Sequence, residues 1–307
     1  MKIVIWLQNA NPGRGGVELL NPAAQILQKL YGKLNAVGFI SESEIGLNGV
    51  KRLAKEDLKN IDFDLILVTG SDIPMIVTNT QSNFVKILKE AKSLGIDEDK
   101  IVLDRVICVP NFTLEKYKKL RHSKLSILST SCFGGFCYHR FGLPFLSPTI
   151  NMFTSDKEFL KFLQNPMENV HKELIFQGTA FEKKIQADYP IFKVGETKWY
   201  MNHYPNFDVA YRKWYERTFR INWFNVLPVM FTENPEVLAE FDKLPFAKKV
   251  CFVPFKSDLY SAYYIDSSRY INGDKFFLIV NGMGSGSANE YDMWDMLLYG
   301  KKTKLNF

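Results

Sequence analysis

The sequence has few of the residues that carry metal or disulfide chemistry: 307 residues include only four cysteines and four histidines. It has no apolar run of the roughly 18 residues that a membrane-spanning helix needs, so we expect no membrane span. Its first residues lack a cationic segment followed by an apolar core, so we expect no signal peptide. Free cysteines in a chain without a secretion signal are typical of a reducing compartment. These absences together predict a cytoplasmic protein with reduced thiols and no bound metal.

Charge of one sign is not concentrated anywhere in the chain. Thirty-nine Lys and Arg against 33 Asp and Glu give a formal charge of +6 without a basic block. We therefore expect no nucleic-acid partner, while the mild positive excess favours a small anionic ligand. A composition of 46% hydrophobic and 14% aromatic residues is that of a folded globular protein.

The first third of the sequence alternates apolar runs with amphipathic segments, which predicts an α/β fold with a Rossmann-like parallel sheet. The expected strands are 3–7, 36–40, 63–68 and 101–109, and the expected helices are 23–30, capped by Asn21, and 83–94. Pro110 and Asn111, together with the basic stretch Lys116–Arg121, form the only plausible boundary. We therefore expect a Rossmann-like domain over residues 1–110 and a second domain over residues 111–307.

The second part is also predicted to be α/β, with a mixed sheet that has more antiparallel character. Its expected helices are 157–163, 208–220 and 236–244, and its expected strands are 125–128, 174–176, 191–194, 199–202, 225–232, 250–255, 263–265 and 276–280. The glycine-rich segment 282–287 lacks the Lys-Ser/Thr ending of a phosphate loop and is interpreted as a flexible loop.

A glycine-containing loop follows the first expected strand, where a dinucleotide fold places its phosphate-binding turn. Gly13, Arg14, Gly15 and Gly16 are the candidate cofactor-binding residues there. The glycines come several residues later than the G-x-G-x-x-G fingerprint requires, so a domain without dinucleotide binding is the favoured interpretation. Arg14 remains a candidate for phosphate contact, and no cofactor is assigned.

The stretch from Ser131 to Arg140 is the most unusual in the chain, because small polar residues and two glycines follow an expected strand. Gly134 and Gly135 permit positive φ and close approach of a ligand, which makes them binding candidates. Cys132 and His139 are candidates for a nucleophile and its base, and with Cys137 they are alternatively metal ligands. A tight turn with a buried small thiol is the favoured interpretation. Open backbone N–H groups at the strand end predict a lowered pKa for Cys132. Ser131, His139 and Arg140 are the further binding candidates.

Two other segments carry polar groups at expected strand ends. Ser147 and Thr149 flank a proline and are interpreted either as pocket hydroxyls or as a turn before a strand. His203 beside Tyr204 is a candidate general base, since the pKa of histidine lies near neutral pH.

The last segment of this kind is the junction that follows the expected helix 208–220. Its Arg220 and Asn222 are candidates for binding a phosphate and a sugar hydroxyl.

Two family resemblances cover nearly the whole chain. Residues 1–109, with KIVIW, NAVGFISES, FDLILVTG and GIDEDKIV, resemble the N-terminal Rossmann-like domain of sugar-modifying proteins. Residues near 123–300 resemble the DUF1919 family, often labelled exopolysaccharide biosynthesis proteins, through SILSTSCFGGFCYHRFGLPFLSPTINMF, HYPNFDVAYRKWYERTFRINWFNVLPVMFTE and FDKLPFAKKVCF. The family pattern Asn-x-Cys-Trp-Gly-Gly stands here as Thr130-Ser131-Cys132-Phe133-Gly134-Gly135.

The resemblance implies a role in surface-glycan or exopolysaccharide biosynthesis, and we expect group transfer on a nucleotide-linked or phosphorylated sugar. A nicotinamide-dependent sugar oxidoreductase and a non-catalytic carbohydrate-binding or assembly protein are the alternatives. Because the carboxyl ends of parallel strands share one edge, the Gly134-Gly135 turn, Ser147 to Thr149, His203 and the Arg220/Asn222 junction are expected to converge on one cleft.

Overall fold

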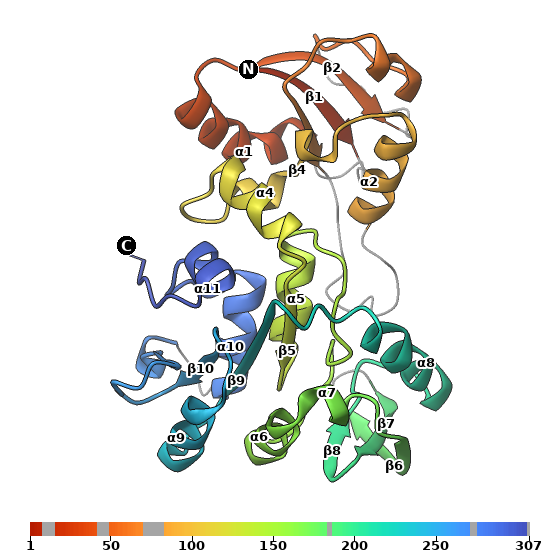
Figure 1. Ribbon diagram of the computed structural model, residues 1–307. Helices are drawn as coiled ribbons and strands as arrows, with labels where there is room; N and C mark the ends of the chain where they lie inside the picture. The colour runs from red at the N-terminus through yellow and green to blue at the C-terminus, as the bar shows by residue number, and fades with distance from the viewer. Residues whose placement is uncertain (8–15, 42–48, 70–82, 183–185, 271–274, 306–307) are drawn as a thin grey trace. The chain divides into compact units, whose positions relative to one another are not determined.

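The computed structural model describes residues 1–7, 16–41, 49–69, 83–182, 186–270 and 275–305 (Figure 1). The chain forms two compact units. The first contains Met1–Lys118 together with Arg140–Pro144, and the second contains Lys119–His139 together with Phe145–Phe307. Strands and eleven α-helices within the described residues confirm the predicted α/β class.

The first unit is built on a four-stranded parallel sheet in the order β2-β1-β3-β4 (Figure 1). The strands are β1 Lys2–Leu7, β2 Asn35–Ser41, β3 Leu65–Thr69 and β4 Ile101–Leu103. The helices are α1 Gly16–Tyr31, α2 Asn83–Ser93, α3 Asp104–Ile107 and α4 Leu114–His122, with 3-10 turns at Lys55–Lys59 and Glu98–Lys100. Every residue of β3 is buried, as expected for a strand covered on both faces.

Two boundaries in this unit differ from expectation. The predicted helix start at Asn21 is wrong, because α1 begins at Gly16 and contains Pro22 in its interior; a proline there removes one internal hydrogen bond without ending the helix. The predicted strand 101–109 stops at Leu103, where the carboxylate of Asp104 accepts a hydrogen bond from the backbone of Arg105 at 2.6 Å and the chain turns into α3.

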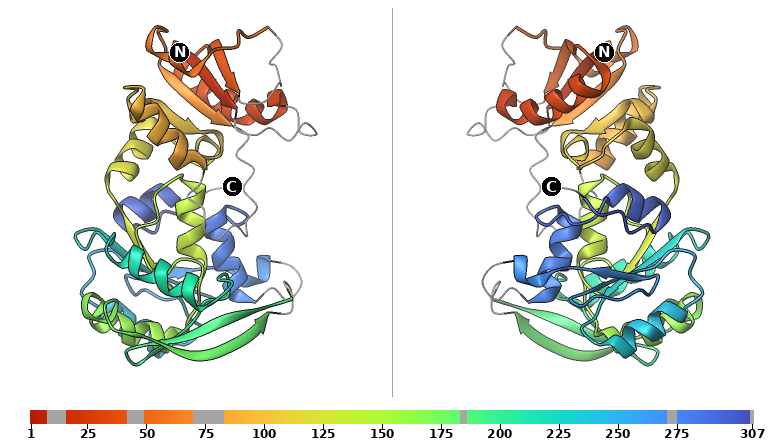
Figure 2. Two further views of the ribbon diagram at one scale, coloured as in Figure 1. Left: turned by 90° about the vertical axis from the view of Figure 1, so that its right-hand side faces the viewer. Right: turned by 90° about the vertical axis from the view of Figure 1, so that its left-hand side faces the viewer.

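The second unit contains a parallel sheet in the order β11-β10-β9-β5 and a separate antiparallel sheet in the order β6-β7-β8. The first is formed by β5 Ser126–Ser129, β9 Val226–Phe231, β10 Val250–Val253 and β11 Ala262–Tyr264. The second is formed by β6 Leu174–Glu182, β7 Ala187–Val194 and β8 Thr197–Tyr200, of which β6 and β7 make a long hairpin (Figure 2). The antiparallel character that the sequence predicted thus lies in a sheet of its own.

The second unit contains seven α-helices among the described residues. They are α5 Phe133–Arg140, α6 Asp156–Gln164, α7 Pro166–Asn169, α8 Phe207–Thr218, α9 Pro235–Lys243, α10 Phe276–Ser285 and α11 Met293–Tyr299. Three of them, α6, α8 and α9, start within one residue of the expected helices 157–163, 208–220 and 236–244. Ser155 caps α6 and Asn206 caps α8, each accepting a backbone N–H of the first turn.

The predicted strand at 276–280 and the predicted loop at 282–287 are both wrong, because these residues form α10 and its cap. A short apolar run such as FFLIV has no period that separates a strand from a buried helix. Gly286 ends α10 with φ of 92°, the left-handed conformation that glycine adopts without strain.

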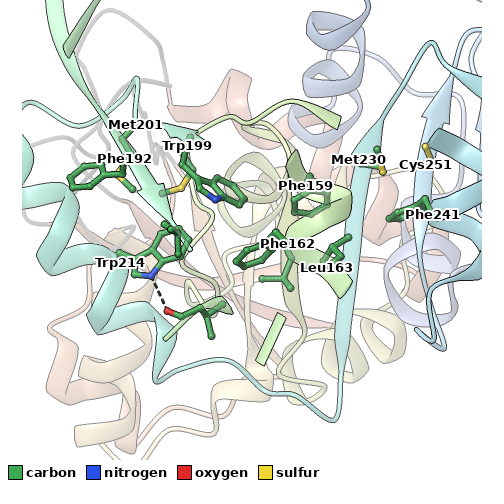
Figure 3. Packing of buried hydrophobic residues seen from close by; sticks show 14 of the residues in the cluster. Phe159, Phe162, Leu163, Phe192, Trp199, Met201, Trp214, Met230, Phe241 and Cys251 are labelled. Atoms are coloured by element: carbon green, nitrogen blue, oxygen red, sulfur yellow. Dashed lines mark hydrogen bonds between the residues drawn. The ribbon is translucent and has the colours of Figure 1, made fainter. Parts of the chain in front are cut away.

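An aromatic cluster forms the core of the second unit (Figure 3). The rings of Trp199 and Trp214 lie 5.7 Å apart, and Phe162 packs edge-on against Trp199 at 5.2 Å. The indole N–H of Trp214 donates to the carbonyl of Val170 at 3.0 Å, so its polar group is satisfied inside the core. This cluster fixes α6 and α8 against β8 and thereby the position of the C-terminal turn of α8.

Candidate functional site

The chain turns from β5 into α5 through a set of local hydrogen bonds at the carboxyl end of the strand. The hydroxyl of Ser129 donates to the carbonyl of Ser131 at 2.8 Å and accepts the backbone N–H of Gly134 at 3.2 Å. The backbone N–H of Ser129 donates to the hydroxyl of Thr149 at 3.0 Å. Small residues follow β5 because only they fit this compact strand-to-helix connection.

Gly134 and Gly135 do not use the positive φ that glycine permits, since both lie in the first turns of α5 with negative φ. Their role is close packing. A Cβ on Gly134 would lie 2.8 Å from the hydroxyl of Ser129, and a Cβ on Gly135 would lie 2.1 Å from Oδ1 of Asn151. Gly135 therefore makes room for the side chain of Asn151, which itself has φ of 55°.

Two polar side chains beside this turn, Thr130 and Asn281, have hydrogen-bonding capacity left over. The hydroxyl of Ser131 donates to Oδ1 of Asn281 on α10 at 2.8 Å, which leaves the amide nitrogen of Asn281 without a partner in the described residues. The hydroxyl of Thr130 is enclosed by protein and has no hydrogen bond. Buried polar groups are usually paired, so the unsatisfied Thr130 hydroxyl at this strand end indicates a place for a polar ligand.

A buried arginine, Arg217, lies in the last turn of α8. Its side chain is 2% exposed, and its Nη1 donates to the hydroxyl of Tyr204. The Tyr204 hydroxyl in turn donates to the carbonyl of Ile150 at 2.7 Å, and the guanidinium lies over the ring of Phe145 at 5.2 Å from its centre. Arg217 forms no ion pair with a carboxylate of the described residues, although buried charges are normally paired.

These groups lie on one continuous path of contacts. Gly135 abuts both Asn151 and Ile150, Ile150 binds Tyr204, and Tyr204 binds Arg217. The turn after β5 and the buried guanidinium are thus connected through two consecutive residues of one loop. We define Thr130, Ser131, Asn151, Arg217 and Asn281 as the polar cluster.

Cys132 lies within the turn and is buried. Burial raises the pKa of its thiol to about 12, because a thiolate is poorly solvated there. The predicted lowering of this pKa is wrong, since the open N–H groups that it required are taken up: the backbone N–H of Gly134 donates to Ser129. The thiol is therefore protonated at neutral pH and is a poor nucleophile. All four cysteines are free.

Ser147 and Thr149 are fully buried, and their hydroxyls bond each other at 3.1 Å. Thr149 accepts a hydrogen bond from the backbone N–H of Ser129, so the two hydroxyls stabilise the turn after β5. The strand expected after them does not form; a single bridge joins Phe153 to Tyr200. Their role as pocket hydroxyls stays a prediction.

His203 precedes Tyr204 and is mostly buried. Burial lowers its pKa, against an opposing effect of Glu182 at the end of β6, so the imidazole is neutral at pH 7 and able to accept a proton. The adjacent Asn202 has a buried side-chain oxygen without a partner. His203 as a general base stays a prediction.

The other binding candidates lie away from the polar cluster. His139 and Arg140 are at the opposite end of α5 from the turn, and Arg140, over the ring of Phe141 at 5.9 Å, groups with the first unit. The contacts of Asn222 place it at the amino end of β5. Its backbone N–H donates a hydrogen bond to the hydroxyl of Ser126 at 2.8 Å.

The Arg220/Asn222 junction therefore does not share the edge of the sheet where the turn after β5 lies. Arg220 is exposed and pairs with Glu216 at 3.7 Å. The loop between α8 and β9 enters the sheet at its amino edge, as any helix-to-strand connection must in a parallel sheet. The expected convergence of all four segments on one edge is wrong for this junction.

Of the glycine loop in the first unit, Gly13, Arg14 and Gly15 lie outside the described residues, and Gly16 is the first residue of α1. Dinucleotide binding there stays a prediction.

The turn after β5 and Arg217 both lie within the part of the chain that matches a known protein family. A domain of unknown function, DUF1919, matches residues 104–298, which is more than half of the chain. The chain belongs to the DUF1919 family. It is also 32% identical over 193 residues to an uncharacterized protein of Haemophilus influenzae, a match that covers 60% of this chain and 87% of the relative.

The DUF1919 region contains the complete polar cluster, but sequence reasoning singled out only one of its members, Ser131, as a binding residue. Arg217 was not among the candidates. The available signal was its spacing: it stands three residues after Trp214 on the apolar face of α8, where a cation has to be buried. Asn151 and Asn281 gave no local signal, because long-range packing alone brings them to the turn.

Among the described residues, no group of three or more His, Cys, Asp and Glu side chains is arranged to hold a metal ion. Within the same residues, the DUF1919 protein has no helix whose length and apolar character suffice to cross a membrane.

Proposed function

We propose that the second unit binds a phosphorylated or nucleotide-linked sugar and takes part in group transfer on it, in surface-glycan or exopolysaccharide biosynthesis. The observation that carries this proposal is Arg217, a buried guanidinium without a carboxylate partner in the described residues, joined through Tyr204, Ile150 and Gly135 to the turn after β5 that contains the unsatisfied Thr130 hydroxyl. An anionic group supplies the missing counter-charge, and a sugar supplies hydroxyls for the remaining polar groups.

The polar cluster divides naturally between these two parts of the ligand. Arg217 provides a fork of N–H donors that suits phosphate oxygens, and Tyr204 holds it in place from one side. Asn281 and Asn151 provide amide groups that can both donate and accept, which matches a sugar hydroxyl. His203, neutral at pH 7, is our candidate for proton transfer.

A second candidate function is binding of a glycan without catalysis. It is favoured by Cys132, whose buried thiol has a pKa of about 12 and therefore offers no nucleophile at neutral pH. Both candidates require the same polar cluster, and they differ in whether the bound sugar is turned over.

We also propose that the chain divides near residue 110 into a Rossmann-like domain and a DUF1919 domain. The parallel order β2-β1-β3-β4 supports the first part of this proposal. The family match, which begins at residue 104, supports the second.

A thermal-shift screen tests the proposal, with sugar phosphates, nucleotide sugars, unphosphorylated sugars and NAD(P) as ligands. We expect stabilisation by phosphorylated or nucleotide-linked sugars that is lost in Arg217→Met and kept in Arg220→Met, a matched control three residues later in the same segment. Turnover of the stabilising ligand favours group transfer, and binding without turnover favours the second candidate. Stabilisation by none of the phosphorylated ligands, or equal stabilisation of both variants, contradicts the proposal.

A further inference from the structure

A second unsatisfied polar cluster lies in the first unit, at the carboxyl edge of its parallel sheet. β3 and β4 pair with Val68 opposite Leu103, so Thr69 and Asp104 come next to each other just beyond the last pair. Neighbouring strands lie about 4.8 Å apart. Arg105 follows at once in α3, which packs against β3. Thr69 and Arg105 therefore belong to the same edge.

Both residues have enclosed donors without partners. Thr69 is 1% exposed, and its hydroxyl makes no hydrogen bond. Nε and Nη2 of Arg105 are likewise enclosed and unbonded. The neighbouring carboxylate of Asp104 accepts a hydrogen bond from the backbone N–H of Arg105 at 2.6 Å.

The charge on Arg105 persists at neutral pH despite this enclosure. Burial lowers the pKa of Arg105 to about 10, while Asp104 and the buried Tyr117 of α4 act in the opposite direction. The edge thus holds a cation, two donor nitrogens without partners and a hydroxyl. Three donor atoms around a positive charge match the oxygens of a phosphate group better than the two oxygens of a carboxylate. Ligands of parallel α/β sheets bind outside the carboxyl ends of the strands.

We propose that the carboxyl edge of β3 and β4 is a binding site for a phosphate group, held by Arg105 and Thr69. The site lies in the first unit and does not depend on the function proposed for the second. Arg105 falls inside the DUF1919 match, whereas Thr69 precedes it. The phosphate group is either inorganic phosphate or part of a phosphate ester.

Fluorine NMR of the full chain labelled with 5-fluorotryptophan separates this site from the other. Trp6 is the only one of the five tryptophans in the first unit, and it pairs with Val68, the neighbour of Thr69. Trp214 stands three residues before Arg217 in the second unit. We expect inorganic phosphate, added at constant ionic strength, to shift the Trp6 resonance saturably. A glucose 1-phosphate titration then shows whether an ester binds more tightly than the free ion.

Arg105→Met should abolish the saturable shift of Trp6, and Thr69→Val should weaken phosphate binding about tenfold, the effect of one hydrogen bond to a charged group. Arg52→Met is the matched control, because Arg52 is an exposed arginine of the same unit that bonds the carbonyl of Ser41 at 2.8 Å. If Arg105→Met does not fold, Thr69→Val decides. No saturable shift in the native protein, or dissociation constants unchanged by these two substitutions, overturns the proposal.

Discussion

Tyr204 and Arg217 form a buried pair. The tyrosine hydroxyl accepts a hydrogen bond from Nη1 of the guanidinium and donates a hydrogen bond to the carbonyl of Ile150 at 2.7 Å. This arrangement orients a cation but does not neutralise it. Within the described residues this enclosed cation has a neutral hydroxyl and aromatic rings as partners and no carboxylate, which favours binding of an anion, and the account of the DUF1919 unit depends on it.

The first prediction concerns Thr130, whose enclosed hydroxyl has no partner. Thr130→Val keeps the shape and removes the unsatisfied group, so we expect the free energy of unfolding to rise by about 1 kcal/mol. Urea unfolding followed by far-UV circular dichroism measures this change. Ser129→Ala is the contrasting variant, since the Ser129 hydroxyl bonds both Ser131 and Gly134 and its loss should destabilise the protein. A destabilised Thr130→Val protein would mean that the hydroxyl is satisfied in solution.

The second prediction compares two glycines beside α5. Gly135→Ala meets the mobile end of the Asn151 side chain, so the fold should survive with Asn151 displaced. Gly284→Ala instead meets the backbone carbonyl of Phe133 at 2.8 Å, which cannot yield without moving α5 away from α10. We expect Gly284→Ala to lower the unfolding free energy by about 1–3 kcal/mol, as overpacking does, and Gly135→Ala by less.

The variant that is less destabilised, Gly135→Ala, should be the one that loses ligand binding. Gly135→Ala should lose most of the thermal shift given by a stabilising sugar phosphate, because Asn151 belongs to the polar cluster. The idea fails if Gly135→Ala binds as the native protein does.

The third prediction concerns thiol reactivity. Cys108 is exposed, whereas Cys132, Cys137 and Cys251 are buried. We expect one thiol to react readily with Ellman's reagent at pH 8 and the other three only on unfolding, with Cys108→Ser removing the fast phase. Rapid labelling of Cys132 in the native protein would contradict the raised pKa.

The fourth prediction concerns alkaline pH. Burial holds the pKa of Cys132, Tyr138 and Tyr204 above the values of the unfolded chain. Above those unfolded values the unfolded state releases protons that the folded state retains, so stability falls as pH rises. Each fully buried group contributes a loss of about 1.4 kcal/mol per pH unit above its unfolded pKa, near 9 for the cysteine and 10 for the tyrosines. We expect cooperative unfolding above pH 10, measured by circular dichroism; stability that is constant to pH 12 would contradict it.

Sequence patterns predicted most of the elements, because local signals determine them. Buried strands such as 65–69 and capped helices such as 156–164 follow from apolar runs and from Ser155 at the cap. The apolar segment from Phe276 was predicted as a strand and is a helix, since a segment buried on all sides has no period to distinguish the two.

The candidate site was predictable only in part. The turn after β5 was found because small polar residues follow an apolar run, and Ser131 lies where expected. Asn281 stands 150 positions away in the sequence and reaches Ser131 only through packing of α10 on α5, at Gly284. Asn222 was placed at the wrong edge because its contacts with Ser123 and Ser126 depend on the tertiary fold.

Isothermal titration calorimetry of the best sugar phosphate or nucleotide sugar, with the native protein, Arg217→Met and Arg220→Met, tests the central claim most directly. We predict that Arg217→Met raises the dissociation constant by a factor of about 10 to 100, corresponding to loss of a charge-assisted hydrogen bond of about 1.5–3 kcal/mol. Arg220→Met should bind as the native protein does. Equal dissociation constants for the native protein and a folded Arg217→Met variant would contradict the claim that this buried arginine binds the ligand.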